Sequence, residues 1–280
     1  MKIFLTGGSG FIGKNFLQLA LKKNHSIFAT TRHRQSFKHK KLKWLIGDFS
    51  YKWKELKKSD ILIHLAAEGV ASNKKNKKKI FTTNIHKSLK LLKNANNFGC
   101  KKWLIASTSS EYGKSLERYK YMDTKTIRRP EDYYSQSKAI FTDRSIQLAI
   151  KNKCKIRIMR IFPVYGCGEK NGRLYTSLKK AAIKGLNFKV TNPFEIRDFS
   201  NVKYVCKILL NASNFKKKKF KCYQIKHIAQ NNVMSVKKFC LIQWKKFKGK
   251  KKKLIFNNNS ENFIRHVSSD SSRWKQFYYE

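Results

Sequence analysis

Short apolar runs alternate with amphipathic helical stretches along the first 165 residues of the chain. Stretches with apolar residues at helical spacing follow the first run and recur at 80–98 and 133–151. The apolar runs, at strand length, lie at 2–6, 26–31, 44–46, 61–67, 102–107 and 155–161. Strands that alternate with helices in this way predict an α/β fold, with a parallel, doubly wound sheet of the Rossmann type.

The pattern changes after about residue 165. Helical spacing appears at 173–185, 202–212 and 235–246, with short strand-like pieces at 188–191 and 223–228. We therefore expect residues 1–165 to form the nucleotide-binding domain and residues 166–280 to form a smaller α+β domain that binds the substrate. The stretch 248–262 is polar, which predicts little regular structure there.

The chain is strongly basic: its 280 residues include 64 Lys and Arg against 16 Asp and Glu, for a formal net charge of +48. Such a charge invites a nucleic-acid interpretation, because Lys and Arg neutralise phosphates. However, lysine is spread through nearly every segment, as in a generally lysine-rich proteome, and no RNA-recognition motif accompanies it. Nucleic acid is therefore not the expected partner.

Cysteine spacing and hydropathy exclude two further classes. The six cysteines form no CxxC pair and no Cys/His cluster at zinc spacing, so no metal is expected. No apolar run reaches the roughly 18 residues of a membrane span, and Gly7 and Gly8 come too early for a secretory signal. These features predict reduced thiols and a cytoplasmic location.

A glycine-rich turn joins the first apolar run to the first helical stretch. Gly7, Gly10 and Gly13 allow a tight turn there. Backbone N–H groups can then approach a pyrophosphate, which the start of the helix stabilises. The strand–turn–helix context predicts a dinucleotide site.

Further motifs resemble the extended short-chain dehydrogenases/reductases, specifically the nucleotide-sugar epimerase/dehydratase family. The resemblance covers about 1–210 and, more faintly, 270–277. In chain order, the motifs are Thr6-Gly-Gly-Ser-Gly-Phe-Ile-Gly13, Gly47-Asp48, His64-Leu-Ala-Ala67, Thr83-Asn84-Ile85, Thr108-Ser-Ser-Glu-Tyr-Gly113, Tyr134-Ser-Gln-Ser-Lys138, Arg160-Ile-Phe-Pro-Val-Tyr-Gly166 and Arg197-Asp-Phe199. The cofactor contacts that the resemblance implies are Gly7, Gly10, Phe11, Ile12, Gly13, Thr31, Arg32, Asp48, Leu65, Ala66, Ala67, Asn84, Tyr134, Lys138 and Pro163.

Tyr134 and Lys138 are the candidate catalytic pair. Four residues apart on a helix, they lie on one side. A nearby cation favours the phenolate, which can take the hydroxyl proton when hydride leaves a sugar carbon. Thr108, four residues before Tyr112, stands at the family's position for the hydroxyl that binds the reacting oxygen. The adjacent Tyr133 lies five residues from Lys138, which makes Tyr134 the expected base.

Dehydratases of this family carry acids after the catalytic hydroxyl. Here those positions are Ser109 and Ser110, and Glu111 is one position off and expected to point elsewhere. A 4,6-dehydratase is therefore not expected. The substrate contacts that the resemblance implies are Thr108, Ser109, Tyr134, Arg173 and Arg197. The guanidinium of Arg197 would bind the substrate's diphosphate, with Arg173 as the second candidate.

The second strand indicates which cofactor is used. An acid at its end would bind the ribose 2′-hydroxyl of NAD, but this chain has Thr31-Arg32-His33-Arg34. Arg32 and Arg34 could bind a 2′-phosphate, which favours NADP(H) over NAD. The alternative is that both arginines belong to the general basic surface.

Together, the motifs and the resemblance predict a nucleotide-sugar 4-epimerase or 4-keto reductase, and the sequence does not distinguish these two activities. A homodimer through the helices that begin at Ile80 and Tyr133 is what the family implies. One alternative is a catalytically retired family member that binds RNA or a protein partner. Another is a reductase of small carbonyl compounds.

Overall fold

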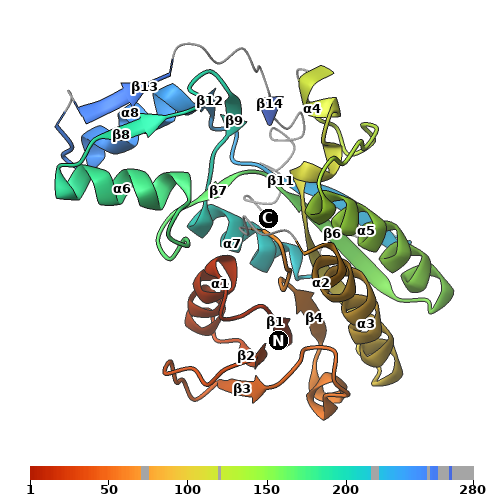
Figure 1. Ribbon diagram of the computed structural model, residues 1–280. Coiled ribbons are helices and arrows are strands. Elements are labelled where there is room, and N and C mark those ends of the chain that lie inside the picture. Colours follow the sequence, from red (N-terminus) through yellow and green to blue (C-terminus); the bar gives the residue numbers. More distant parts are fainter. Residues whose placement is uncertain (71–75, 119–120, 216–220, 251–252, 258–264, 267–280) are drawn as a thin grey trace.

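The computed structural model describes residues 1–70, 76–118, 121–215, 221–250, 253–257 and 265–266. A parallel sheet of seven strands forms its centre (Figure 1). Its order is β11-β6-β5-β4-β1-β2-β3, with bounds β1 Lys2–Thr6, β2 Ser26–Thr31, β3 Leu42–Ile46, β4 Ile61–His64, β5 Lys102–Thr108, β6 Lys155–Ile161 and β11 Tyr223–Ile228. The expected doubly wound α/β fold is confirmed.

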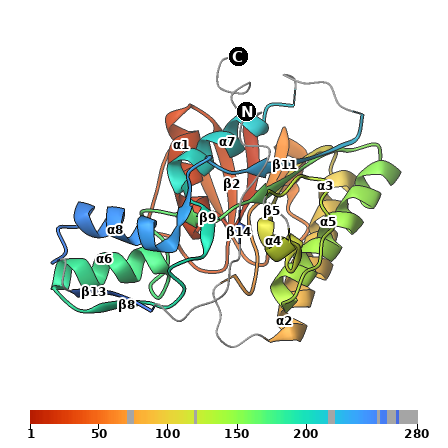
Figure 2. The same ribbon diagram turned by 90° about the horizontal axis from the view of Figure 1, so that it is seen from above.

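Helices cover both faces of this sheet, because its central strands are apolar on both sides. In β1, Ile3 and Leu5 pack against α1 (Phe11–Lys22) and α7 (Val202–Ala212), whereas Phe4 packs on the opposite face. That opposite face carries α3 (Ser88–Asn97) and α5 (Tyr133–Lys151), as Figure 2 shows. Side chains alternate across a strand, so one apolar strand supplies both layers of the core.

Two segments lie elsewhere than the sequence pattern indicates. We placed 202–212 and 223–228 in the smaller portion, but β11 pairs with β6 from Tyr223–Ile156 to Ile228–Ile161. The helix α7 packs beside α1 on the large sheet. Both segments therefore belong to the nucleotide-binding fold, and the chain returns to this sheet after building part of the smaller portion.

The smaller portion packs α6 (Leu174–Lys184) against α8 (Val236–Lys246) at one end of the molecule (Figure 2). Phe199 stacks on Phe239 with ring centroids 3.9 Å apart. The short strands around them are β7 Val164–Tyr165, β8 Phe188–Val190, β9 Ile196–Asp198, β10 Ser200–Asn201, β12 Val233–Ser235, β13 Leu254–Phe256 and β14 Arg265–His266.

The prediction of little structure in 248–262 is wrong for β13, which pairs in parallel with β8. Its three apolar residues lie between lysines and asparagines, and Leu254 and Phe256 pack onto the α6–α8 core. The faint resemblance at 270–277 lies outside the described residues.

The two long helices of the second face are α5 and the helix that the sequence predicts at 80–98. Asp132 and Ser135 form a reciprocal capping box that starts α5 at the predicted residue. The helix predicted at 80–98 begins earlier, as α2 (Lys77–Phe81), and continues through a π-helical segment, η2 (Thr82–Lys87), into α3. Such π segments are frequent at functional sites.

The remaining described elements are short. They are η1 Lys54–Lys58, η3 Ser109–Tyr112 and α4 Ser115–Arg118. None of the helices in the described residues combines the length and apolar character that crossing a bilayer requires.

Candidate active site

The glycine turn after β1 leaves no room for side chains. Gly7 has a φ of +73°, and a Cβ there would lie 2.7 Å from the Ala66 backbone nitrogen. A Cβ on Gly13 would lie 2.0 Å from the Gly7 carbonyl oxygen. Gly10 precedes Phe11 and Ile12 as the N-cap of α1, where no side-chain capping bond occurs in the described structure. This open helix start fits a pyrophosphate.

Buried hydrogen bonds fix the loop opposite this turn. The His64 ring contacts the Thr6 hydroxyl at 2.6 Å and the Ser88 hydroxyl at 2.9 Å. Burial, with the nearby Lys138 charge, lowers the pKa of His64 to about 3, so the ring is neutral. The Thr6 hydroxyl also accepts from Ala66 N at 3.3 Å. Leu65, Ala66 and Ala67 are thereby held beside Gly7.

Asn84 acts within the protein. Its amide donates to the Glu68 carbonyl at 3.0 Å and to the Ser137 hydroxyl at 2.9 Å, and its oxygen accepts from Glu68 N. These bonds fasten the loop after β4 to η2 and α5. In the structure, Asn84 therefore holds the loop after β4, which is predicted to contact the cofactor, by hydrogen bonds within the protein.

The other expected cofactor residues lie at the ends of strands. Burial opposes ionisation of Asp48, but hydrogen bonds from Lys87 and Ser50 hold its pKa below its ordinary value. Thr31 is buried and its hydroxyl donates to the His33 carbonyl at 2.8 Å. Arg32 is exposed directly after β2. Pro163 follows β6, and its carbonyl accepts from Ser200 N.

Thr108, Tyr134 and Lys138 meet where β5 ends beside the first turns of α5. The Thr108 side chain lies beside the Tyr134 hydroxyl and acts to lower its pKa. Thr108 caps η3, because its hydroxyl oxygen accepts from Ser110 N at 3.1 Å. The Lys138 ammonium group is 3% exposed and donates to the Ala106 carbonyl at 2.7 Å. The adjacent Ser109 is buried.

Burial dominates the charge state of this cluster. It raises the pKa of Tyr134 well above its ordinary value, helped by Glu111, while Thr108 and Arg173 act in the opposite direction. Burial also lowers the pKa of Lys138 to about 8, and Glu111 opposes that shift. The expected lowering of the Tyr134 pKa by a nearby cation is thus outweighed in the protein alone. Tyr134 is a phenol there, ready to donate a proton.

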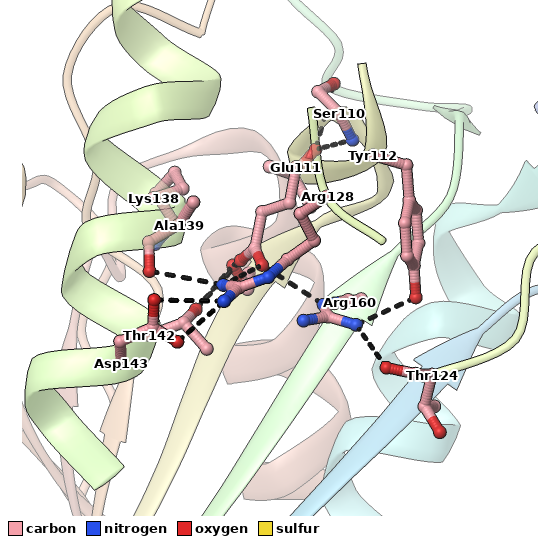
Figure 3. A network of polar contacts seen from close by, with 12 residues as sticks. Ser110, Glu111, Tyr112, Thr124, Arg128, Lys138, Ala139, Thr142, Asp143 and Arg160 are labelled. Atoms are coloured by element: carbon pink, nitrogen blue, oxygen red, sulfur yellow. Dashed lines mark hydrogen bonds and ion pairs between the residues drawn. The ribbon is translucent and has the colours of Figure 1, made fainter. Parts of the chain in front are cut away.

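The Tyr112–Gly113 turn is anchored by a second polar network (Figure 3). Arg160 NH1 donates to the Tyr112 hydroxyl at 2.8 Å and to the Thr124 carbonyl at 2.9 Å. Glu111 points into the interior, toward Arg160 and Arg128. The expectation that Glu111 points elsewhere is confirmed.

Arg173 and Arg197 differ in their surroundings. Arg173 precedes α6, with its NH1 3.5 Å from the Val70 carbonyl and its Nε 3.8 Å from Glu169. Arg197 in β9 is held in a two-pronged ion pair with Glu195, at 2.8 and 2.6 Å. The remaining guanidinium nitrogen, NH1, takes no part in that pair.

Glu169 lies in the loop that follows β7. Burial raises its pKa to about 7, although Arg173 opposes the shift. Its Oε2 atom has no hydrogen-bond partner among the described residues. The same loop reaches the start of α1, where Asn15 donates to the Cys167 carbonyl at 3.1 Å.

Sequence comparison identifies the family. The profile of the NAD dependent epimerase/dehydratase family matches residues 3–225. The chain belongs to this family. The family uses NAD(P), which agrees with the glycine turn after β1.

Individual relatives are distant. The chain is 27% identical over 191 residues to UDP-glucose 4-epimerase of Vibrio cholerae, covering 66% of this chain and 57% of that protein. It is 28% identical over 216 residues to GDP-6-deoxy-D-talose 4-dehydrogenase of Aggregatibacter actinomycetemcomitans, covering 75% and 69%. The chain thus spans little more than half the length of the Vibrio relative that it matches.

Solved structures confirm the fold. UDP-glucose 4-epimerase of Thermotoga maritima, solved with UDP-glucose, superposes with a TM-score of 0.82. The match covers 99% of this chain and 92% of that one at 21% identity. At this identity the likeness concerns the fold, the parallel sheet together with the small C-terminal sheets.

Several polar residues at the site were not identified from the sequence. Lys87, Glu169 and Glu195 each pair with a predicted site residue. The spacing of Glu169 and Glu195 from their arginines, four and two residues, offered a signal. Lys87 offered none, because it reaches Asp48 only through the packing of η2 against the end of β3.

Proposed function

We propose that the chain is an NAD(P)-dependent oxidoreductase that acts at carbon 4 of a nucleotide-linked sugar, as a 4-epimerase or a 4-keto reductase. The observation that carries this proposal is the placement of Tyr134 beside Thr108, at the end of β5, with the buried Lys138 one turn along α5. The tight turn at Gly7 and Gly13, where neither residue has room for a Cβ, supports dinucleotide binding at the same edge of the sheet.

A bound nicotinamide dinucleotide would supply the hydride acceptor or donor. In the reducing direction, the Tyr134 phenol donates its proton to the carbonyl oxygen that becomes the sugar hydroxyl. Thr108 hydrogen-bonds the same oxygen and fixes its position. In the oxidising direction, Tyr134 takes that proton back, which requires nearby positive charge, because burial raises the pKa of its hydroxyl. Lys138 is the residue that supplies this charge from one helical turn away.

The local sequence does not support dehydration. Ser109 and Ser110 occupy the two positions after Thr108, and Glu111 is enclosed by Arg128 and Arg160. Elimination of water needs an acid beside the sugar, and this turn offers hydroxyls there. Epimerisation and ketone reduction need hydride exchange with the bound dinucleotide and the proton transfer that Tyr134, with Thr108 beside it, can perform; neither needs a second acid.

The proposed activity is tested by mixing the protein with NADPH or NADH and a panel of nucleotide-linked 4-keto-6-deoxysugars. Loss of reduced-nicotinamide absorbance would establish the reductase. If the absorbance is constant, the unmodified nucleotide sugars are incubated with NAD(P) and analysed for the C4 epimer. Absence of both reactions with a folded, dinucleotide-binding protein would contradict the proposal.

We further propose that Arg32 favours NADP(H), because it is exposed directly after β2 and no acid lies there. Replacing Arg32 with alanine should weaken NADPH binding by about tenfold to a hundredfold, as loss of a charge-assisted hydrogen bond does, and leave NADH binding nearly unchanged. Fluorescence titration of both reduced dinucleotides measures this. Arg34→Ala is the comparison, and equal NADPH affinity in both variants and wild type would show that the arginines are ordinary surface residues.

Arg197 is proposed to bind the substrate's diphosphate through NH1, while Glu195 orients its guanidinium. The Arg197→Met variant should raise KM for the nucleotide sugar by about tenfold to a hundredfold with kcat little changed, because the contact is remote from the reacting carbon. Lys203→Met, which removes an exposed charge on α7, is the matched control. A large kcat loss in Arg197→Met with unchanged KM would refute this role.

The proposed assembly is a homodimer formed by the α2–η2–α3 and α5 helices. On that surface Tyr133 is 38% exposed, and its ring lies edge-on to Phe81 at 6.5 Å. Aromatic residues at a helical surface are enriched in protein interfaces, and here Tyr133 is exposed beside the partly buried Phe81. Sedimentation equilibrium of the wild-type chain tests this, and a monomer at micromolar concentration would exclude a stable dimer.

A further inference from the structure

The Glu111 carboxylate is fully buried at the junction of β5, α5 and β6 (Figure 3). Arg160 Nε donates to its Oε2 at 3.1 Å, and Arg128 NH1 lies 3.3 Å from the same atom. Thr142 donates to Oε1 at 2.8 Å, and the Ser107 hydroxyl also bonds Oε1. A buried acid with this many donors is held in one orientation.

Glu111 and Lys138 are attached to neighbouring points of the same two elements. Lys138 donates to the carbonyl of Ala106 in β5, and Glu111 accepts from Ser107, the next residue. On α5, Glu111 accepts from Thr142, one turn beyond Lys138. The carboxylate therefore lies behind the catalytic cluster, within the same packed layer.

Charged and titratable groups lie on several of the elements near Lys138. Arg160 on β6 and Arg128, whose NH1 also contacts the Ala139 carbonyl at 3.4 Å, are positive. His64 on β4 is neutral, and Tyr134 on α5 is a protonated phenol. Glu111 is the negative group that faces this set from η3.

We propose that Glu111 is a positioning residue for the Tyr134–Lys138 pair: its buried carboxylate offsets the charges of Arg128 and Arg160, so that Lys138 remains an ammonium ion. Arg128 is held on its outer side by Asp143, at 2.8 and 2.9 Å. This inference rests on the proposed function, in which Lys138 acts as a cation.

The electrostatic argument fixes the direction of the effect. Burial lowers the pKa of Lys138 to about 8, and the Glu111 carboxylate opposes that lowering. The ammonium form is present below this pKa and is lost as the pH rises through it. Removing the carboxylate lowers the pKa further, whereas removing a neighbouring guanidinium raises it.

Two variants with opposite charge changes test the proposal. Glu111→Gln should move the alkaline limb of the kcat/KM pH profile to lower pH, by roughly one unit, and Arg128→Gln should move it to higher pH. Asp143→Asn, which removes an exposed partner of the same arginine, should leave the limb within a few tenths of a unit of wild type. A purely structural network would lower the rate in these variants without moving the limb in opposite directions.

A second measurement needs no substrate. Trace labelling of lysines with acetic anhydride over a range of pH, read by peptide mass spectrometry, gives the titration midpoint of Lys138 in the folded protein. The midpoint should fall in Glu111→Gln and rise in Arg128→Gln. If these shifts appear without turnover of any nucleotide sugar, Glu111 still controls the Lys138 charge and the proposed reaction fails.

The proposal is overturned if Lys138 titrates at the same pH in wild type and both variants. Glu111→Gln leaves two arginines facing a neutral amide, which is costly in a buried site. If that variant does not fold, Arg128→Gln still decides the matter. A raised midpoint in Arg128→Gln supports the charge balance, and an unchanged midpoint refutes it.

Discussion

Replacing Tyr134 with phenylalanine is expected to lower kcat by about a hundredfold to ten-thousandfold, the usual contribution of a positioned acid–base group. The substitution removes one oxygen, which lies beside Thr108 in the native site. The ring and its packing remain, so the sugar carbon and the hydride partner keep their positions. The reaction loses the group that exchanges the proton with the sugar oxygen.

The measurement is steady-state turnover of whichever nucleotide sugar the protein converts, with melting temperature and NADPH affinity recorded alongside. Tyr133→Phe is the matched control, because it makes the same chemical change one residue away on an exposed ring. We expect Tyr133→Phe to retain wild-type kcat. If Tyr134→Phe turns over at the wild-type rate, proton transfer does not pass through this phenol.

The arrangement of the sheet follows from the sequence where local signals are complete. The start of α5 is predicted at the right residue, and in the structure Asp132 and Ser135 cap each other there. The central strand β4 is buried throughout and begins with three apolar residues, Ile61 to Ile63, as expected of a strand covered on both faces. For such elements, the residue types of the segment itself are enough to predict its place in the fold.

The misplaced elements are those whose environment depends on distant partners. The sequence Tyr223 to Ile228 alternates polar and apolar residues, like a strand of an exposed small sheet. It becomes an edge strand of the large sheet, because β6 presents an unpaired parallel edge next to it. Nothing in the residue types of β11 distinguishes these two destinations.

The charge state of the site is likewise set by distant contacts. The spacing of Tyr134 and Lys138 gives their shared helix side, but not their burial, which raises the pKa of Tyr134 and lowers that of Lys138. Glu111 meets Arg160 across 49 positions in the chain and Arg128 across 17. These partners converge only when β5, β6 and α5 are assembled, so the sequence pattern alone left Glu111 without a role.

Replacing Gly13 with alanine is expected to destabilise the protein by about 1–3 kcal/mol, the usual cost of forcing an extra methyl group into a packed site. The added Cβ would lie 2.0 Å from the Gly7 carbonyl oxygen and 2.8 Å from Gly8 Cα. Both contacts are with backbone, which cannot rotate away as a side chain would. Relief therefore requires α1 to move from β1, and that movement opens the turn proposed to hold the pyrophosphate.

Urea unfolding and NADPH titration measure the two consequences together. Gly10→Ala is the control within the same turn, because its Cβ would meet just the Gly7 carbonyl, at 3.2 Å. That variant should lose less stability than Gly13→Ala, because a contact at 3.2 Å requires a much smaller backbone shift than one at 2.0 Å. If Gly13→Ala is as stable as wild type and binds NADPH equally well, the close packing of α1 on the turn is not what shapes the dinucleotide site. If Gly13→Ala instead loses both stability and NADPH affinity, the same close backbone contact between α1 and the glycine turn is needed for folding and for dinucleotide binding.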